Sequence, residues 1–234
     1  MAPIGKISFY AYGTLRYGVR VSAGSIDGDA AAEIVTTPGP GVVFGPHVRG
    51  FDYDGGPLQG IGKVSFYAYQ TLKYGARSSE GTIDGDAYEE ILTAPGPGPA
   101  FSPHIRGFDY DATQVRSIGK VSFNAFSTTS YGCTVAAADM ESDGAGQYGD
   151  GFREIVAGKG PGPSHDATVS AFDYDGLTIV PKTSALVDTT VYGINVAGGD
   201  ADAGDVEEIA VAVGPDPAGP AHVSVWEWDP AVEY

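Results

Sequence analysis

The sequence repeats one pattern four times, and this repetition constrains the fold more than any other feature because each copy must form the same supersecondary unit. Every copy contains a Tyr-Gly pair, an acidic loop, a Glu-Ile stretch, a glycine-rich turn and a final aromatic and acidic run. Segments of sequence Ile-Gly-Lys, which begin at Ile4, Ile61 and Ile118, are spaced 57 residues apart. The four repeat units span residues 17–69, 74–126, 131–187 and 192–229.

The repeat units consist of short strand-like stretches. Residues 6–12, 63–69 and 120–126 are rich in β-branched and aromatic residues, and residues 181–187 are a looser counterpart. Three further strands are expected in each unit: one after the Tyr-Gly pair, one from the Glu-Ile stretch, and one up to the aromatic and acidic run. No window has apolar residues at i, i+3 and i+4 between helix caps. The sequence therefore predicts an all-β fold with four strands per unit.

Four strands in each of four units predict radial repetition, as in a β-propeller. The last unit supplies only three strands, whereas the N-terminus supplies one unattached strand, residues 6–12. We therefore predict a single domain over residues 1–234: a four-bladed β-propeller with four antiparallel strands per blade, closed by the N-terminal strand joining the C-terminal blade. An open array would leave unpaired strand edges, which proteins avoid. The structural alternative is a half-propeller that pairs with a second copy.

The composition limits the possible partners. Apolar residues make up 42% of the chain, which is enough for a core, and 35 glycines and 16 prolines indicate many turns. The formal net charge of −17 argues against nucleic acids and insertion into anionic membranes, which favour basic proteins. The single cysteine, Cys133, excludes an internal disulfide, and we expect it to be buried. The N-terminus shows no signal-peptide pattern, which leaves open that the chain is a mature or excised portion of a longer protein.

The acidic loops are the candidate binding sites. Alternate acidic residues in a tight turn direct their oxygens at one point, and calcium takes about six to eight oxygen ligands. Without a cation, carboxylates this close repel one another. The candidate metal ligands are Asp27, Asp29 and Glu33 in loop one, Asp84, Asp86 and Glu90 in loop two, Asp139, Glu141, Asp143 and Glu154 in loop three, and Asp200, Asp202, Asp205 and Glu208 in loop four. The alternative is a metal-free turn held by hydrogen bonds from side chain to backbone.

The motifs of each unit also resemble a known family. Asp-Gly-Asp, Glu-Ile-Val, Pro-Gly-Pro-Gly, His-Val-Arg and Phe-Asp resemble the FG-GAP/VCBS repeats of integrin-α-like β-propellers, in particular the bacterial secreted type, over essentially the whole chain. The resemblance implies calcium in the acidic loops on one face and partner-binding loops on the opposite face. Two loops depart from the family pattern because Ser25 and Thr82 stand at the first position and Ala30 and Ala87 replace the last glycine. The missing carboxylate is expected to weaken calcium binding.

One histidine and one Tyr-Gly pair occur in every unit. The histidines are His47, His104, His165 and His222, and the tyrosines are Tyr17, Tyr74, Tyr131 and Tyr192. We interpret the histidines as structural residues beside Gly-Pro turns, with a symmetric transition-metal or haem site on the axis as the alternative. The tyrosines are expected to pack between blades or to fix turns.

The sequence contains no catalytic motif, and its paired carboxylates occur only inside the repeated loops. We therefore predict a non-enzymatic, calcium-supported interaction or adhesion module, located outside the cell or at the cell surface. Its partner is expected to be a protein or glycan at the cell surface, or another copy of the chain in a surface array or filament. The alternatives are a propeller that binds a small ligand, glycan, metal or haem in its axial channel or on the loop face opposite the acidic loops, and a hydrolase or lyase built on the same fold.

Overall fold

The computed structural model describes residues 4, 5, 7–13, 16–71, 73–128, 130–141, 151–204 and 206–229. This described part contains fifteen strands and no helix, and thus no helix that could cross a membrane. Blade 1 consists of β1 (Val19–Gly24), β2 (Glu33–Pro38), β3 (His47–Asp52) and β4 (Gln59–Tyr67). Blade 2 consists of β5 (Ala76–Gly81), β6 (Glu90–Pro95), β7 (His104–Tyr110) and β8 (Val115–Asn124). Blade 3 consists of β9 (Cys133–Ala138), β10 (Glu154–Lys159), β11 (Thr168–Tyr174) and β12 (Ile179–Leu186). Blade 4 consists of β13 (Ile194–Gly199), β14 (Glu208–Val213) and β15 (Val223–Trp226).

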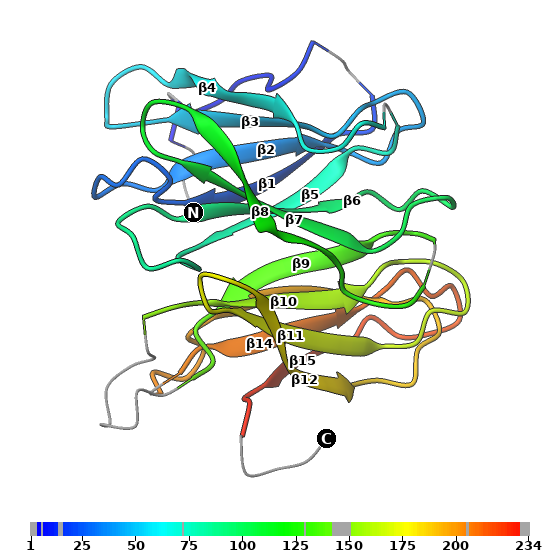
Figure 1. The fold of residues 1–234 in the computed structure, drawn as a ribbon. Coiled ribbons are helices and arrows are strands. Elements are labelled where there is room, and N and C mark those ends of the chain that lie inside the picture. The colour runs from blue at the N-terminus through cyan, green and yellow to red at the C-terminus, as the bar shows by residue number, and fades with distance from the viewer. Residues whose placement is uncertain are drawn as a thin grey trace.

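Each blade is an antiparallel sheet whose strands follow one another in sequence order. Figure 1 shows the four blades side by side, from blue at the N-terminal end to red at the C-terminal end. Their inner strands are neighbours in the order β1, β5, β9 and β13. The predicted all-β, four-bladed β-propeller is confirmed.

The apolar core lies between successive blades. One cluster joins blades 1 and 2 through residues such as Val35 and Ile91, and a second joins blades 2 and 3 through residues such as Leu92 and Ile155. A third cluster joins blades 3 and 4 and contains Val156. Cys133 is buried in the second cluster, as the sequence predicts.

The Tyr-Gly pairs form the turns that link one blade to the next. Tyr74 and Gly75 both have left-handed backbone conformations, with φ of 66° and 62°. Their N–H groups donate to the carbonyl oxygens of Gly41 and Phe44 in blade 1, at 2.7 and 2.9 Å. Tyr131 and Gly132 make the equivalent bonds to blade 2, each at 2.8 Å. The repeated pair therefore has both of the roles that the sequence suggested, in the turn and between blades.

The predicted closing strand is wrong in the structure. The described residues of the segment 7–13 form no strand, and the sheet of blade 4 has three strands. The segment lies instead on blade 1, where the Tyr12 hydroxyl donates to the carbonyl oxygens of Thr36 and His47 at 2.8 and 2.7 Å. These contacts hold the segment at one end of the row of blades, whereas blade 4 lies at the other end (Figure 1).

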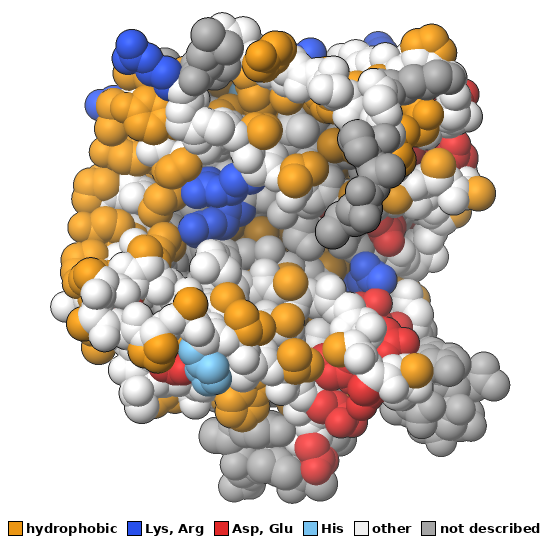
Figure 2. Space-filling model, turned by 180° about the vertical axis from the view of Figure 1, so that it is seen from behind, with side chains coloured by type: hydrophobic (Ala, Val, Ile, Leu, Met, Phe, Trp, Pro, Cys, Tyr) orange, Lys and Arg blue, Asp and Glu red, His pale blue; other side chains and the backbone are white. Residues whose placement is uncertain are grey.

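The two end blades consequently leave their inner strands open. Val19 and Val21 of β1 are 51% and 68% exposed, whereas Val135, the counterpart of Val21 in β9, is 6% exposed. Seen from the opposite side, the molecule has a hollow in which Lys and Arg side chains are visible (Figure 2). The described blades therefore form an open arc with two unsatisfied ends.

The turn geometry predicts a strong effect of a single methyl group at Gly96. A Cβ atom at Gly96 would lie 1.6 Å from the carbonyl oxygen of Tyr74, which belongs to the backbone of the turn. We expect Gly96→Ala to lower the free energy of unfolding by about 1–3 kcal/mol or more because the backbone must shift. Gly119→Ala is the matched control, since a Cβ atom there meets nothing within 4 Å. Urea unfolding of both variants checks this, and equal stabilities would contradict it.

Candidate metal centres in the acidic loops

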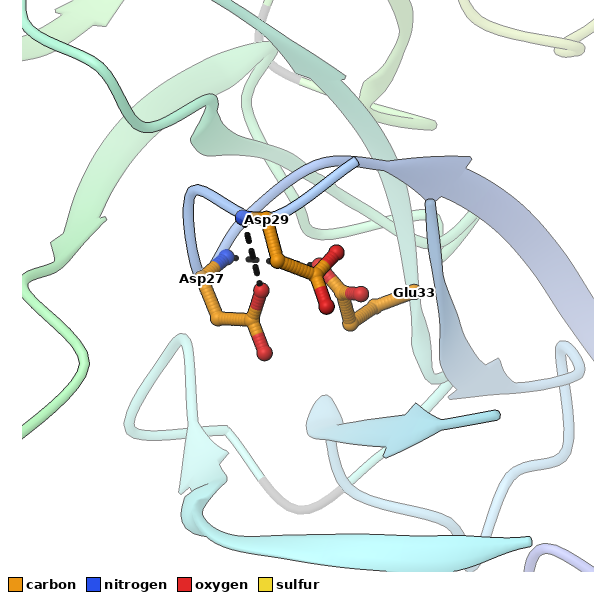
Figure 3. Close-up of side chains that lie close together, drawn as sticks. All are labelled: Asp27, Asp29 and Glu33. Carbon is orange, nitrogen blue, oxygen red and sulfur yellow. Dashed lines mark hydrogen bonds between the residues drawn. The ribbon is translucent and has the colours of Figure 1, made fainter. Parts of the chain in front are cut away.

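Among the residues that the structure describes, three acidic loops bring three carboxylates together. In each group, one oxygen per residue lies within 4.8 Å of the others. The groups are Asp27, Asp29 and Glu33 in blade 1, Asp84, Asp86 and Glu90 in blade 2, and Asp200, Asp202 and Glu208 in blade 4. Figure 3 shows the first group, in which the loop aspartates and Glu33 at the start of β2 lie close together. Figure 2 shows that acidic side chains gather along one edge of the molecule.

The loops are tight turns stabilised by their own aspartates. Asp29 accepts a hydrogen bond from the N–H of Ala31 at 2.6 Å, and Asp27 accepts one from the N–H of Asp29 at 3.3 Å. Loop two repeats both bonds with Asp84 and Asp86. The left-handed conformation between the aspartates falls on a glycine in both loops, Gly28 and Gly85. Alanine at the last-glycine position therefore fits this turn.

The glutamate that starts the second strand of each blade connects the loop to the sheet. Glu33 and Glu90 are fully buried, and their Oε2 atoms accept the N–H groups of Ile26 and Ile83 at 2.8 and 2.7 Å. The other carboxylate oxygen, Oε1, is buried in both residues and has no hydrogen-bond partner. A buried polar atom without a partner is costly, so these two oxygens are open positions for a cation or a proton.

Burial raises the pKa of Glu33 to about 7 and that of Glu90 to about 8. Neighbouring carboxylates act in the same direction, Asp27 on Glu33 and Asp84 on Glu90. Like charges disfavour the ionised form, whereas a bound cation would favour it. The loops are therefore built so that ionised glutamates require a compensating positive charge.

The structure adds two aspartates that the sequence analysis did not select. Asp52 at the end of β3 and Asp109 near the end of β7 each have a buried Oδ1 without a hydrogen-bond partner. Burial raises the pKa of both, and the charges of the adjacent loop aspartates raise it further. Asp52 and Asp109 therefore add a negative charge near the acidic groups of blades 1 and 2. The Phe-Asp motif that recurs in the repeat is the sequence signal for these two aspartates.

Blade 3 has a lysine among its acids. The Lys182 ammonium lies 2.5 Å from Glu141 Oε1 and 3.7 Å from Asp173 Oδ2. Asp173 is the counterpart of Asp52 and Asp109. Burial lowers the pKa of Lys182, but the hydrogen bond to Glu141 and the charges of Glu141, Asp173 and Glu154 outweigh it, so the pKa is raised. The protein itself thus supplies a positive charge in this blade.

A shorter bulge explains the position of this lysine. In blade 1, three residues of β4 lie between Ile61 and Ser65, which face consecutive residues of β3. In blade 3, Lys182 alone lies between Pro181 and Thr183 in the corresponding bulge. The counterpart lysine of blade 1, Lys63, is exposed. The bulge of blade 3 is therefore two residues shorter than that of blade 1, and its lysine contacts the acidic group instead of solvent.

The remaining predicted ligands have other positions. The Asp139 N–H donates to Glu207 Oε2 of blade 4 at 2.9 Å, and its side chain accepts the N–H of Gly151. Asp143 and Asp205 lie outside the described residues. In the part of the chain that the structure describes, Asp139, Glu141 and Glu154 do not form a three-carboxylate group.

Each histidine has a local polar contact. His47 and His104 contact the hydroxyls of Ser65 and Ser122 in their own blades, at 3.0 and 3.1 Å. His165 contacts the carbonyl oxygen of Gly160 at 3.0 Å, and His222 contacts Asp188 at 2.9 Å. Among the described residues, no histidine belongs to a group that could hold a metal.

Comparison with models of known protein families found no match, and comparison with curated proteins found no similar sequence. The function of the chain is therefore inferred from the geometry of its own residues.

The buried glutamates predict that stability decreases with rising pH when no metal is bound. An unfolded glutamate loses its proton near its ordinary pKa of 4.5, whereas folded Glu90 keeps it up to a pKa of about 8. The folded state binds more protons between these values, so the free energy of unfolding falls across this range, by on the order of 5 kcal/mol. We expect Glu90→Gln to flatten this fall in EDTA.

Urea unfolding at a series of pH values measures this dependence. Glu227→Gln, at an exposed position, is the control and should keep the wild-type slope. An unchanged slope in Glu90→Gln would show that this carboxyl is ionised in the folded protein.

The lysine of blade 3 predicts a stability difference between two matched variants. Lys182→Met leaves Glu141 and Asp173 without their positive partner, and we expect a loss of about 1–3 kcal/mol in EDTA. Lys63→Met removes the exposed counterpart and should change stability by less than about 0.5 kcal/mol. Thermal and urea unfolding distinguish the two, and losses of equal size would contradict the proposed role of Lys182.

Proposed function

We propose that this chain is a calcium-binding β-propeller that acts as a non-enzymatic interaction or adhesion module at the cell surface. The observation that carries this proposal is the buried, unpartnered oxygen of Glu33 and Glu90 beside two loop aspartates. Carboxylate oxygens are the ligands that calcium prefers, and the groups contain no nitrogen or sulfur ligand. Bound calcium would partner these oxygens and offset the repulsion between the carboxylates.

Blade 3 supports the same conclusion from the opposite direction. Its acidic group already contains the Lys182 ammonium, 2.5 Å from Glu141. Where the chain provides its own cation, a metal is not needed, whereas in blades 1 and 2 the buried Oε1 atoms of Glu33 and Glu90 have no partner. Blade 4 has a three-carboxylate group of the same kind. We therefore propose calcium sites in blades 1, 2 and 4 and none in blade 3.

Calcium in these loops would make one edge of each blade rigid. In blade 1, the ion would join the loop aspartates to Glu33 at the start of β2 and to Asp52 at the end of β3. The same edge is joined to blade 2, because the Ser25 N–H donates to Glu89 Oε2 at 2.9 Å and the Glu89 N–H donates to the Ser25 carbonyl at 3.0 Å. Stiffening of the loops would thus extend across the junction between blades.

The opposite face is the proposed partner-binding surface. It carries the turns between the second and third strands, where Phe101 packs on Tyr74 with ring centroids 5.6 Å apart. A pocket of about 190 Å³ on this face is lined by Tyr69, Phe101 and His104, among others. Aromatic rings beside polar groups suit a protein or glycan partner. Millimolar extracellular calcium would fill sites of about 10⁻⁴ to 10⁻³ M affinity, which supports a location outside the cell. The resemblance to FG-GAP/VCBS repeats agrees with this proposal and remains a hypothesis.

Thermal unfolding in EDTA and in millimolar calcium tests the proposal, with magnesium as a control ion. A site that binds only the native state adds about 2.7 kcal/mol at a hundred times its dissociation constant. We expect a calcium-specific rise in Tm, which the combined substitutions Asp27→Asn, Asp84→Asn and Asp202→Asn should remove. Glu227→Gln should retain the full rise.

Isothermal titration calorimetry should find calcium sites in blades 1, 2 and 4 only, and Asp84→Asn should remove one of them. A Tm that is the same in calcium and EDTA would overturn the proposal and leave the loops as metal-free turns.

A further inference from the structure

We propose that copies of this chain associate head to tail, with the N-terminal segment 7–13 of one copy completing blade 4 of the next as its fourth strand. This inference goes beyond the proposed function, because it concerns the two end blades rather than the loop face opposite the acidic loops, and it does not depend on calcium. Four features carry it: the position of the N-terminal segment, the open edge of β15, the match between the two, and the open inner strands.

The N-terminal segment makes the contacts of an outer strand from a preceding blade. The Tyr12 hydroxyl donates to Thr36 and His47 carbonyls at 2.8 and 2.7 Å. Its counterpart at the end of blade 1, Tyr69, donates to the Thr93 and His104 carbonyls of blade 2 at 2.9 and 2.7 Å.

Two further contacts repeat in the same way. The Arg49 guanidinium donates to the Ala11 carbonyl as Arg106 does to that of Ala68. The rings of Phe9 and Phe51 lie 4.6 Å apart, the same distance as those of Phe66 and Phe108. The segment 7–13 therefore has the place of a fourth strand, but it has no sheet of its own.

Blade 4 has the complementary defect. Within the described residues, β15 pairs with β14 alone, whereas the third strand of every other blade pairs on both sides. Val223 of β15 is 66% exposed, whereas its counterpart Ile105 of β7, in a strand that pairs with β8, is fully buried in the core between blades 2 and 3. Unpaired edges of this kind recruit a further strand. One blade thus lacks the strand that the other end of the molecule carries without a sheet.

The side chains of the two ends match in the register of the complete blades. In blade 2, His104, Ile105 and Arg106 face Asn124, Phe123 and Ser122. The same register places His222, Val223 and Ser224 opposite Tyr10, Phe9 and Ser8. Two exposed apolar side chains, Val223 and Phe9, would cover each other.

Ser8 and Ser224 would reproduce a pair that blade 3 already contains. There, the hydroxyls of Ser170 and Ser184 lie 2.9 Å apart, and Ser224 and Ser8 are their respective counterparts. The rings of His47 and Tyr67 are stacked with centroids 4.8 Å apart. His222 and Tyr10 would form the equivalent pair. The hydroxyl and ring side chains at the two ends therefore match the side chains that pair inside a complete blade.

The inner strands β1 and β13, at the two ends of the row of blades, also carry complementary hydrogen-bonding groups. Arg20 donates to the Ala76 carbonyl of blade 2 at 2.8 Å, and Arg77 donates to the Cys133 carbonyl of blade 3 at 2.9 Å. Thr134 continues the series by donating to the Ile194 carbonyl of blade 4 at 3.1 Å. The next donor is Asn195, which is exposed, and its acceptor would be the carbonyl of exposed Val19 in the copy that supplies the N-terminal segment. Blade 1 of the same molecule lies at the far end of the row, so the acceptor belongs to a second copy (Figure 1).

Cysteine cross-linking between two single variants tests both the partner and the register. Ser8→Cys and Ser224→Cys are prepared separately in the full chain, mixed and oxidised in EDTA. We expect a covalent dimer in the mixture at a level about tenfold above that of either variant alone. Ser65→Cys mixed with Ser224→Cys is the matched control, because Ser65 already faces Arg49 within blade 1 and should not cross-link.

Three results would overturn the proposal. The first is a mixture that cross-links no more than the single variants. The second is a cross-link equal to that of the Ser65→Cys control. The third is a Ser8→Cys, Ser224→Cys double variant that forms its disulfide within one chain, which would indicate that the molecule closes on itself.

A second measurement uses the mass of the assembly in solution. The wild type is expected to have at least twice the mass of the 24.1 kDa chain by light scattering, and Val223→Asp should reduce it to one chain. Leu177→Asp, also at an exposed apolar side chain but in the turn between β11 and β12, should leave the mass unchanged. Because all of these measurements are made in EDTA, a failure of the calcium proposal would leave them unaffected.

Discussion

The hydrogen bond between the buried glutamate and its acidic loop is the interaction on which both the fold and the candidate sites depend. In every blade, the Oε2 atom of this glutamate accepts a backbone N–H from the loop, at 2.8 Å for Ile26, 2.7 Å for Ile83, 2.8 Å for Met140 and 2.7 Å for Ala201. The bond closes the loop over the edge of the sheet. It also forces a carboxylate into the interior, where a charge is costly without a partner. The repeat therefore creates the same electrostatic problem four times.

The blades solve this problem in different ways. In blades 1 and 2, the second oxygen of the glutamate has no protein partner, and the raised pKa values of Glu33 and Glu90 show that a proton is one solution. In blade 3, a bulge two residues shorter brings Lys182 to the acids. The proposed calcium ion would have the same role in blades 1 and 2 as the Lys182 ammonium has in blade 3. The blades therefore differ in the fourth strand, which carries Lys182 in blade 3, and not in the loop alone.

The sequence predicted the repeated architecture well because the period and the strand patterns are local properties. It predicted which acids share a loop for the same reason. It missed Asp52 and Asp109 because their position near the acidic loops, at the ends of β3 and β7, depends on how the strands pair. Lys182 was missed because the number of residues in a bulge decides where its side chain points. The prediction of the closing strand was wrong because the number of strands alone does not determine which blade, or which molecule, the N-terminal segment joins. Tyr12, Ala11 and Phe9 specify the blade that follows, and those contacts hold in the structure.

The character of the two ends distinguishes this molecule from an ordinary open repeat protein. Terminal units of such proteins usually present polar outer faces that protect the apolar interior. Here, the outer side of β1 presents Val19 and Val21, and the free edge of β15 carries Val223 and Val225, all of them exposed. Both ends thus have the composition of a junction between blades. A high negative charge keeps such a molecule soluble, and it does not cover these ends. In the proposed head-to-tail assembly, segment 7–13 of one neighbouring copy would cover the edge of β15, and β13 of another would cover β1.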